Sequence, residues 1–358
     1  MGFIVMEDDL LTINVNSAKE QPIKLSEITE KVVAIELEMT NNSLMNITQL
    51  ERIHFTEDYI VVCEAFKIML FDKTGKFIRQ IGSQGQGPGE FSGIVNTTAD
   101  IKKKHLYVLS QEYKIICYTF EGEFVKEIPV GKGGDLKYIN YMNNNLLYLV
   151  RLRETENDKT IMQTVLLTID DNTSVSVGLE VNKVISNDLK IPYVGNRSNN
   201  DYINYDGENV FLYNTDILSK TLHDTLYQLK NNQLIPYLKL KFSDADYRNR
   251  NVVLDLSQPE KAINVMNSLM KISNIYKSSR YVFSVYSHQQ RYYFCYDLKT
   301  GKGYKDKGGC TDDIHTKEKV NIRPFDSDAN MFYYLHTKID NSAKDEPNPT
   351  LYIGTLKK

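Results

Sequence analysis

The stretch from 59 to 81 recurs at 106–128, which is 47 residues later and without a gap. In each copy three short apolar runs follow one another, and the last two are joined by a turn that ends in Gly75 or Gly122. Glycine has no Cβ and adopts positive φ without strain, as tight turns between strands often require. Each copy therefore predicts three short antiparallel strands.

A fourth apolar run precedes each copy, at 47–55 and at 93–101. Four antiparallel strands in a repeat of about 40–50 residues are typical of one blade of a β-propeller. A single four-stranded sheet cannot bury both of its faces, whereas blades stacked around an axis cover one another. The repeat therefore predicts an all-β fold made of blades.

Looser copies of the unit follow, beginning near 136, 202, 272 and 322. The last of them has only three strands, and its missing strand is predicted at 32–37. Pairing the N- and C-terminal strands in one blade would close the ring and remove its open edges. We expect a six-bladed β-propeller with four-stranded antiparallel blades over 32–358, after an N-terminal extension over 1–31. Five or seven blades are the alternatives.

The segment 257–271 interrupts the β pattern, because its apolar residues recur at helical spacing. Ser257 and Glu260 are spaced as a capping box, which is typical of a helix start. We expect one helical insertion here, which either fills space between blades or covers one end of the central channel.

Composition excludes several classes of protein. The net charge of −3 and the dispersed Lys and Arg residues argue against a nucleic-acid partner. The 24 Tyr and 14 Phe favour strands. The four cysteines (Cys63, Cys117, Cys295 and Cys310) are far apart, so we expect free thiols rather than a disulfide scaffold or a zinc site.

The chain has no apolar run near the ~20 residues that a membrane-spanning helix needs. Its first nine residues lack the basic segment and the long apolar segment of a signal peptide. Two alternatives remain at this point. Either the protein is cytoplasmic, or its leader is not part of this sequence.

No motif for catalysis, for a metal or for a cofactor is found. The glycine-rich stretch 82–89 lacks the Gly-Lys-Ser/Thr ending of a phosphate-binding loop. The six histidines lack metal-ligand spacing, no Gly-x-Ser-x-Gly motif occurs, and no acidic pair fits an EF-hand. We therefore expect no metal and no cofactor, although catalytic residues drawn from separate blades would leave no motif.

Propeller topology predicts where a ligand would bind. The loops that enter the first strand of each blade share one face with the loops between the second and third strands. On this face we expect a mixed aromatic and polar ligand-binding surface. Its residues are predicted to be Glu64, Phe66, Gln84, Gln86, Glu90, Gln111, Glu112, Tyr113, Arg151 and Arg153.

The stretch 71–91, with its Asp-Lys-Thr-Gly turn and its Gly-Gln-Gly-Pro-Gly run, resembles an NHL-type propeller repeat. The chain is similar to a six-bladed β-propeller family of Bacteroidetes, to which 224–229 and 348–357 also correspond. The resemblance implies an exported precursor, a periplasmic or cell-surface location and a possible lipid anchor. It implies no reaction and no site residues.

These observations favour a non-catalytic binding module whose ligand is a protein, a peptide or a glycan. The alternative is a hydrolase or lyase with an active site assembled across blades at the central channel.

Overall fold

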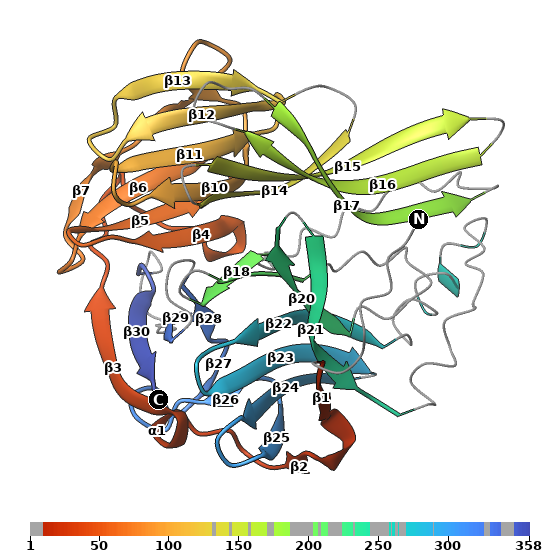
Figure 1. Ribbon diagram of the computed structural model, residues 1–358. Coiled ribbons are helices and arrows are strands. Elements are labelled where there is room, and N and C mark those ends of the chain that lie inside the picture. The colour runs from red at the N-terminus through yellow and green to blue at the C-terminus, as the bar shows by residue number, and fades with distance from the viewer. Residues whose placement is uncertain are drawn as a thin grey trace. The chain divides into compact units, whose positions relative to one another are not determined.

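The structure is a computed structural model that describes residues 10–130, 134–142, 145–156, 159–169, 175–186, 203–206, 209–213, 224–231, 233–243, 270–288, 290–325, 330–337 and 347–358, with 258, 260, 261 and 264. The chain is nearly all β and folds as a six-bladed β-propeller, as predicted (Figure 1). It divides into two compact units. Unit 1 comprises Met1–Val33, Lys190–Tyr334 and Ile353–Lys358, and unit 2 comprises Ala34–Leu189 and Leu335–Tyr352.

Blades 1 and 2 belong to unit 2 and are the two copies of the 47-residue repeat. Their strands follow one another across each sheet in chain order. Gly75 and Gly122 precede the last strands with φ of 90° and 92°. A Cβ on Gly75 would lie 2.1 Å from the Glu36 carbonyl oxygen. This turn therefore requires glycine both for its positive φ and for the close approach of Glu36. The strands are β4 (Leu50–Phe55), β5 (Tyr59–Glu64), β6 (Lys67–Asp72), β7 (Phe77–Gln80), β10 (Ile94–Asp100), β11 (His105–Ser110), β12 (Lys114–Thr119) and β13 (Phe124–Pro129).

Blade 3 also belongs to unit 2, and three of its strands are longer than any other strand that the structure describes. They are β14 (Gly134–Met142), β15 (Asn145–Glu156), β16 (Lys159–Ile169) and β17 (Val175–Ser186). One apolar cluster joins blade 1 to blade 2, with Val61 and Leu70 facing Leu106 and Ile116. A second cluster, around Tyr148, joins blade 2 to blade 3. Adjacent blades thus bury each other's faces, as the repeat predicts.

Blades 4 and 5 belong to unit 1 and also share one apolar cluster, to which Leu238 and Phe294 contribute. The strands of blade 4 are β18 (Ile203–Asp206), β19 (Asn209–Leu212), β20 (Thr225–Lys230) and β21 (Gln233–Lys241). Those of blade 5 are β22 (Lys271–Lys277), β23 (Tyr281–His288), β24 (Gln290–Asp297) and β25 (Lys302–Lys307).

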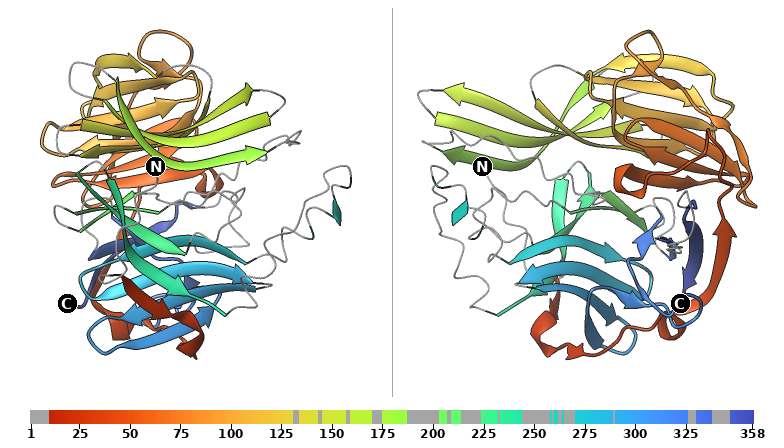
Figure 2. Two further views of the ribbon diagram at one scale, coloured as in Figure 1. Left: turned by 45° about the vertical axis from the view of Figure 1, so that its right-hand side comes forward. Right: turned by 180° about the vertical axis from the view of Figure 1, so that it is seen from behind.

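The N-terminal segment adds a fifth strand to each of these two blades. β1 (Leu11–Asn14) pairs in parallel with β21, and β2 (Lys19–Glu20) pairs in parallel with β25. Ile13 and Val15, in β1 and in the 3₁₀ turn η2 (Val15–Ser17), are buried in the cluster of blades 4 and 5. Figures 1 and 2 show this segment in red along the blue strands of blade 5. Residues 11–20, expected only as part of an extension, therefore cover the edges of two sheets.

The sixth sheet contains strands from both ends of the chain, as predicted. Its strand order is β28 (Arg323–Pro324), β29 (Met331–His336), β30 (Thr350–Leu356) and β3 (Thr29–Glu36). The helix α1 (Leu25–Ile28) leads into β3, and the Lys357 N–H donates to the Ile28 carbonyl oxygen at 2.9 Å. A hairpin of β26 (Cys310–Thr311) and β27 (Lys319–Val320) precedes this sheet.

Two further predictions concern the helix and the cysteines. Most of the helical insertion expected at 257–271 lies outside the described residues. All four cysteines are buried free thiols, as predicted. Burial raises the pKa of Cys117 to about 11 and that of Cys310 to about 12, so these thiols are poor nucleophiles at neutral pH.

Candidate functional site

Four loops of unit 2 meet at one end of blades 1 and 2, as the topology predicts. The Ala65 N–H donates to the Gln49 carbonyl oxygen (2.8 Å), and the Ile94 N–H donates to the Ala65 carbonyl oxygen (2.7 Å). The Gln111 N–H donates to the Gly93 carbonyl oxygen (2.9 Å). These bonds join the segment that enters β4, the β5–β6 turn, the crossover into β10 and the β11–β12 turn. We call residues 44–49, 64–67, 82–93 and 110–114 the loop face.

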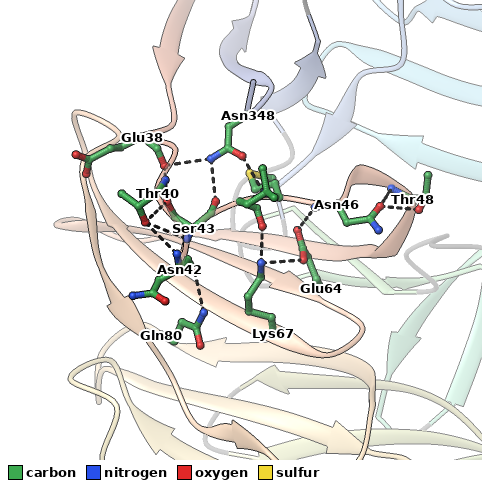
Figure 3. Close-up of polar contacts among 12 residues, drawn as sticks. Glu38, Thr40, Asn42, Ser43, Asn46, Thr48, Glu64, Lys67, Gln80 and Asn348 are labelled. Atoms are coloured by element: carbon green, nitrogen blue, oxygen red, sulfur yellow. Dashed lines mark hydrogen bonds and ion pairs between the residues drawn. The ribbon is translucent and has the colours of Figure 1, made fainter. Parts of the chain in front are cut away.

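Glu64 is buried under the segment that leads into β4. Its Oε1 accepts a hydrogen bond from the Asn46 N–H at 2.6 Å, and its Oε2 lies 3.7 Å from Lys67 Nζ, which also donates to the Leu44 carbonyl oxygen (Figure 3). Burial raises the pKa of Glu64, although the Asn46 amide and the Lys67 ammonium oppose this rise. This carboxylate therefore fixes residues 44–46 above the β5–β6 turn.

Glu112 plays the same part in the β11–β12 turn. Its Oε1 accepts from the Ser92 N–H at 2.7 Å, and its Oε2 accepts from the Ser110 hydroxyl. Burial opposes ionisation, but these hydrogen bonds outweigh it and lower the pKa of Glu112. Gln111 covers Gly93, where a Cβ would lie 2.8 Å from the Gln111 side chain.

The glycine-rich crossover is held by two more carboxylates. It is closed by the parallel pair β8 (Ser83–Gln84) and β9 (Glu90–Phe91). Glu90 accepts from the Gly87 N–H at 2.8 Å, and Glu127 accepts from the Gly89 N–H at 2.7 Å and from Lys114 Nζ at 2.9 Å. Because these loop amides already bind side-chain carboxylates, they are not a vacant phosphate cradle.

The exposed side chains of the loop face are apolar or neutral. Phe66 is 40% exposed, and Leu44 and Ile47, which flank the contacts with Glu64 and Lys67, are 48% and 43% exposed. Gln84 and Gln86 are exposed on the crossover, where Gln84 Nε2 donates to the Ser92 carbonyl oxygen at 3.3 Å.

The three remaining predicted residues belong to blades 2 and 3. Tyr113 is half-buried at the end of the β11–β12 turn. Arg151 and Arg153 belong to β15, where Arg151 is the register partner of Asp135 and Thr164. The structure describes the backbone of these two arginines but not their side chains. The structure therefore brings together eight of the ten residues predicted as a ligand site.

Asn348 was not predicted, and it anchors the segment between β3 and β4. Its Oδ1 accepts from the Met45 N–H at 2.8 Å, and its Nδ2 donates to the carbonyl oxygens of Ser43 (2.8 Å) and Glu38 (3.1 Å) (Figure 3). One side chain from the segment before β30 thus satisfies three backbone groups of this linker. No sequence motif signals such a contact.

A buried polar cluster on the first strands of blades 1–3 was also missed. Arg52 donates to the Thr97 carbonyl oxygen (3.0 Å) and to the Tyr138 hydroxyl (2.7 Å), and its guanidinium carbon lies 4.8 Å from the Tyr138 ring centroid. His54 Nε2 lies 2.8 Å from Thr97 Oγ1. These four residues are almost fully buried, so they hold three blades together rather than face a substrate. The sequence signal is that Arg52 and His54 alternate with the apolar residues Ile53 and Phe55 in β4.

Neither a metal site nor a membrane span is found in the part of the chain that the structure describes. No group of three or more His, Cys, Asp or Glu side chains is arranged to hold a metal ion there. Within the same residues, no helix has the length and apolar character to cross a bilayer.

Comparison with known proteins assigns a family and supports the fold. A model of the family DUF4934, described as a domain of unknown function, matches residues 10–355. A search of curated proteins finds no match. A Bacteroides fragilis protein whose name describes it as exported has a similar structure, with a TM-score of 0.66 and 15% identity over 98% of this chain and 100% of that chain. At this identity the likeness shows the fold alone.

Two WD40 structures are more distant. The RRP9 WD40 repeats match with a TM-score of 0.45 and 8% identity over 94% of this chain and 99% of that chain. The Neurospora crassa Pan2 WD40 domain matches with a TM-score of 0.43 and 10% identity over 98% of this chain and 89% of that chain.

Proposed function

We propose that this chain, which belongs to the family DUF4934, is a non-catalytic binding module that recognises a peptide or a protein segment at its loop face. One observation carries the proposal. Leu44, Ile47 and Phe66 expose large apolar side chains on two hydrogen-bonded loops whose backbone is held by the Glu64 and Lys67 contacts. Exposed apolar groups on a rigid support are typical of binding hot spots.

The chemistry of the surface favours a peptide over a glycan. Leu44 and Ile47 offer branched aliphatic surface, which complements apolar side chains. Gln84, Gln86 and Gln111 add carboxamide groups, which complement peptide N–H and C=O groups. The acidic residues of the loop face already accept hydrogen bonds from its own backbone, so their engagement supports binding rather than acid–base catalysis.

The proposal is tested by selecting ligands from a displayed library of random peptides and measuring their affinity by calorimetry. Phe66→Ser is expected to weaken binding of the selected peptides at least about tenfold, because the aromatic anchor is lost. Ile78→Ser is the control, since Ile78 is 37% exposed but lies on the last strand of blade 1, outside the loop face. It is expected to leave binding unchanged.

Two results would count against this function. One is equal binding by wild type and Phe66→Ser. The other is a failure to select any peptide. If the chain then binds an array of neutral or acidic glycans, the glycan-binding alternative is favoured. If it turns over glycoside, ester or uronate substrates, the enzymatic alternative is favoured.

We also propose that the protein is exported to the periplasm or the cell surface, where a lipid anchor on its precursor would hold it. The support is the resemblance to exported Bacteroidetes propellers and the similar fold of the Bacteroides fragilis protein named as exported. Cell fractionation with an antibody against this chain tests it, and recovery only with cytosolic markers would contradict it.

A further inference from the structure

A buried hydroxyl at the junction of blades 2 and 3 lacks a partner among the described residues. Tyr148 is only 2% exposed, and its Oη makes no hydrogen bond within that part of the chain. Other buried tyrosines do make one. Tyr118 donates to the Gly89 carbonyl oxygen (2.7 Å), and Tyr213 donates to the Ile272 carbonyl oxygen (3.0 Å). A buried hydroxyl without a partner is costly, so its presence requires a reason.

Tyr113 packs against the same apolar cluster and has an unfavourable backbone conformation. Its φ is 61°, in the left-handed region that bulky residues rarely adopt. The β11–β12 turn places three residues between Ser110 and Lys114, whereas the β5–β6 turn places two between Glu64 and Lys67. The extra residue puts the half-buried Tyr113 ring against the cluster that contains Tyr148.

Strain at Tyr113 and an unsatisfied hydroxyl at Tyr148 thus occur in one cluster, at the edge of the loop face. The walls of the cluster are apolar and include Leu109, Ile115 and Val130. Such surroundings suit an aromatic ring that carries one hydrogen-bonding group. A rotation of the Tyr113 side chain away from the cluster would free the apolar surface on which its ring packs.

We infer that Tyr113 and Tyr148 form a second subsite, which binds a tyrosine side chain of the peptide ligand. The ligand ring takes the place of the Tyr113 ring against Leu109 and Ile115, and the ligand phenol oxygen accepts a hydrogen bond from Tyr148. This inference rests on the proposed function, because it assumes that the loop face binds a peptide. It adds the residue type that anchors the peptide.

The first test needs no ligand and compares two variants by thermal unfolding. Tyr118→Phe removes a hydrogen bond and is expected to lower the Tm. Tyr148→Phe removes only an unsatisfied hydroxyl and is expected to leave the Tm unchanged or to raise it. If Tyr148→Phe lowers the Tm as much as Tyr118→Phe does, the hydroxyl has a structural partner and the inference is wrong.

The second test titrates N-acetyl-tyrosinamide and N-acetyl-phenylalaninamide into the full chain and follows binding by NMR. Wild type is expected to prefer the tyrosine compound about fivefold, which corresponds to one neutral hydrogen bond. Tyr148→Phe is expected to abolish this preference, and Tyr113→Gly to raise the affinity for both compounds because the site is then open. A preference that persists in Tyr148→Phe would overturn the inference.

The selected peptides separate this inference from the proposed function. If they bind through Phe66 but lose no affinity in Tyr148→Phe, the second subsite is wrong and the binding function stands. If Phe66→Ser also has no effect, the loop face itself is not the binding surface.

Discussion

Single carboxylates hold many of the loops of this protein by accepting hydrogen bonds from backbone amides. Asp312 is the most complete case. Its Oδ1 accepts from the N–H groups of Ile314 and His315, and its Oδ2 accepts from the N–H and hydroxyl of Thr316 and from the Tyr334 hydroxyl. Burial by itself would raise its pKa, but these hydrogen bonds lower the pKa to about 2.

Asp312 is expected to make stability depend on pH in the acid range. Because its pKa is lower in the folded chain than in the unfolded chain, its contribution is fully present above about pH 4 and is lost as the pH falls towards about 2. The size of that contribution is about 2 kcal/mol. Asp312→Asn should be less stable at pH 7 and should lose this part of the pH dependence. Urea unfolding at a series of pH values between about 2.5 and 7 measures both effects. An unchanged dependence in the variant would contradict this account.

Loop carboxylates show what sequence can and cannot predict at this scale. Topology identifies Glu64 and Glu112 as residues of the loop face, and the structure places both there. Their role as acceptors from Asn46 and Ser92 could not be predicted, because backbone amides carry no sequence signal. The positive φ of Tyr113 could not be predicted from the repeat either, because the equivalent residue Phe66 lies in a turn of a different length.

Elements that repeat were predictable, whereas elements that pair over long distances were not. The repeat predicts three strands within 59–81, and β5, β6 and β7 lie there, because alternation and turn glycines act locally. The parallel pairing of β1 with β21 joins Leu11 to Leu238. A strand of four residues has too little periodicity to indicate such a partner.

The linker between β3 and β4 depends on Asn348, and this dependence can be measured. Asn348→Ala removes three hydrogen bonds and is expected to destabilise the chain by about 2–3 kcal/mol. Asn42→Ala is the control, because Asn42 lies exposed in the same linker and uses its main-chain N–H and carbonyl oxygen for its hydrogen bonds with Thr40 and Gln80. Chemical unfolding should show a loss of stability for the first variant only. An equal loss of stability in both variants would mean that the linker is sensitive to substitution in general and not to the loss of the Asn348 hydrogen bonds.

The whole molecule combines a fold that the sequence predicts with a surface that it predicts only in part. The repeat indicates six blades, and the orphan strand at 32–37 indicates closure by both chain ends, as the sixth sheet confirms. The NHL-type description of the repeat stays a prediction. So does the ligand site, whose members Phe66 and Gln86 are exposed while Glu64 is buried.

Acidic side chains hold the loop face in one shape and leave its apolar and amide groups available for binding. Residue-resolved amide hydrogen exchange on the full chain measures whether they do so. The amides of Asn46, Gly87, Gly89 and Ser92 should exchange slowly, because each donates to a carboxylate. Glu64→Ala should speed the exchange of Asn46 while Gly87 and Gly89 stay protected. Fast exchange at all four amides in the wild-type protein would contradict the claim.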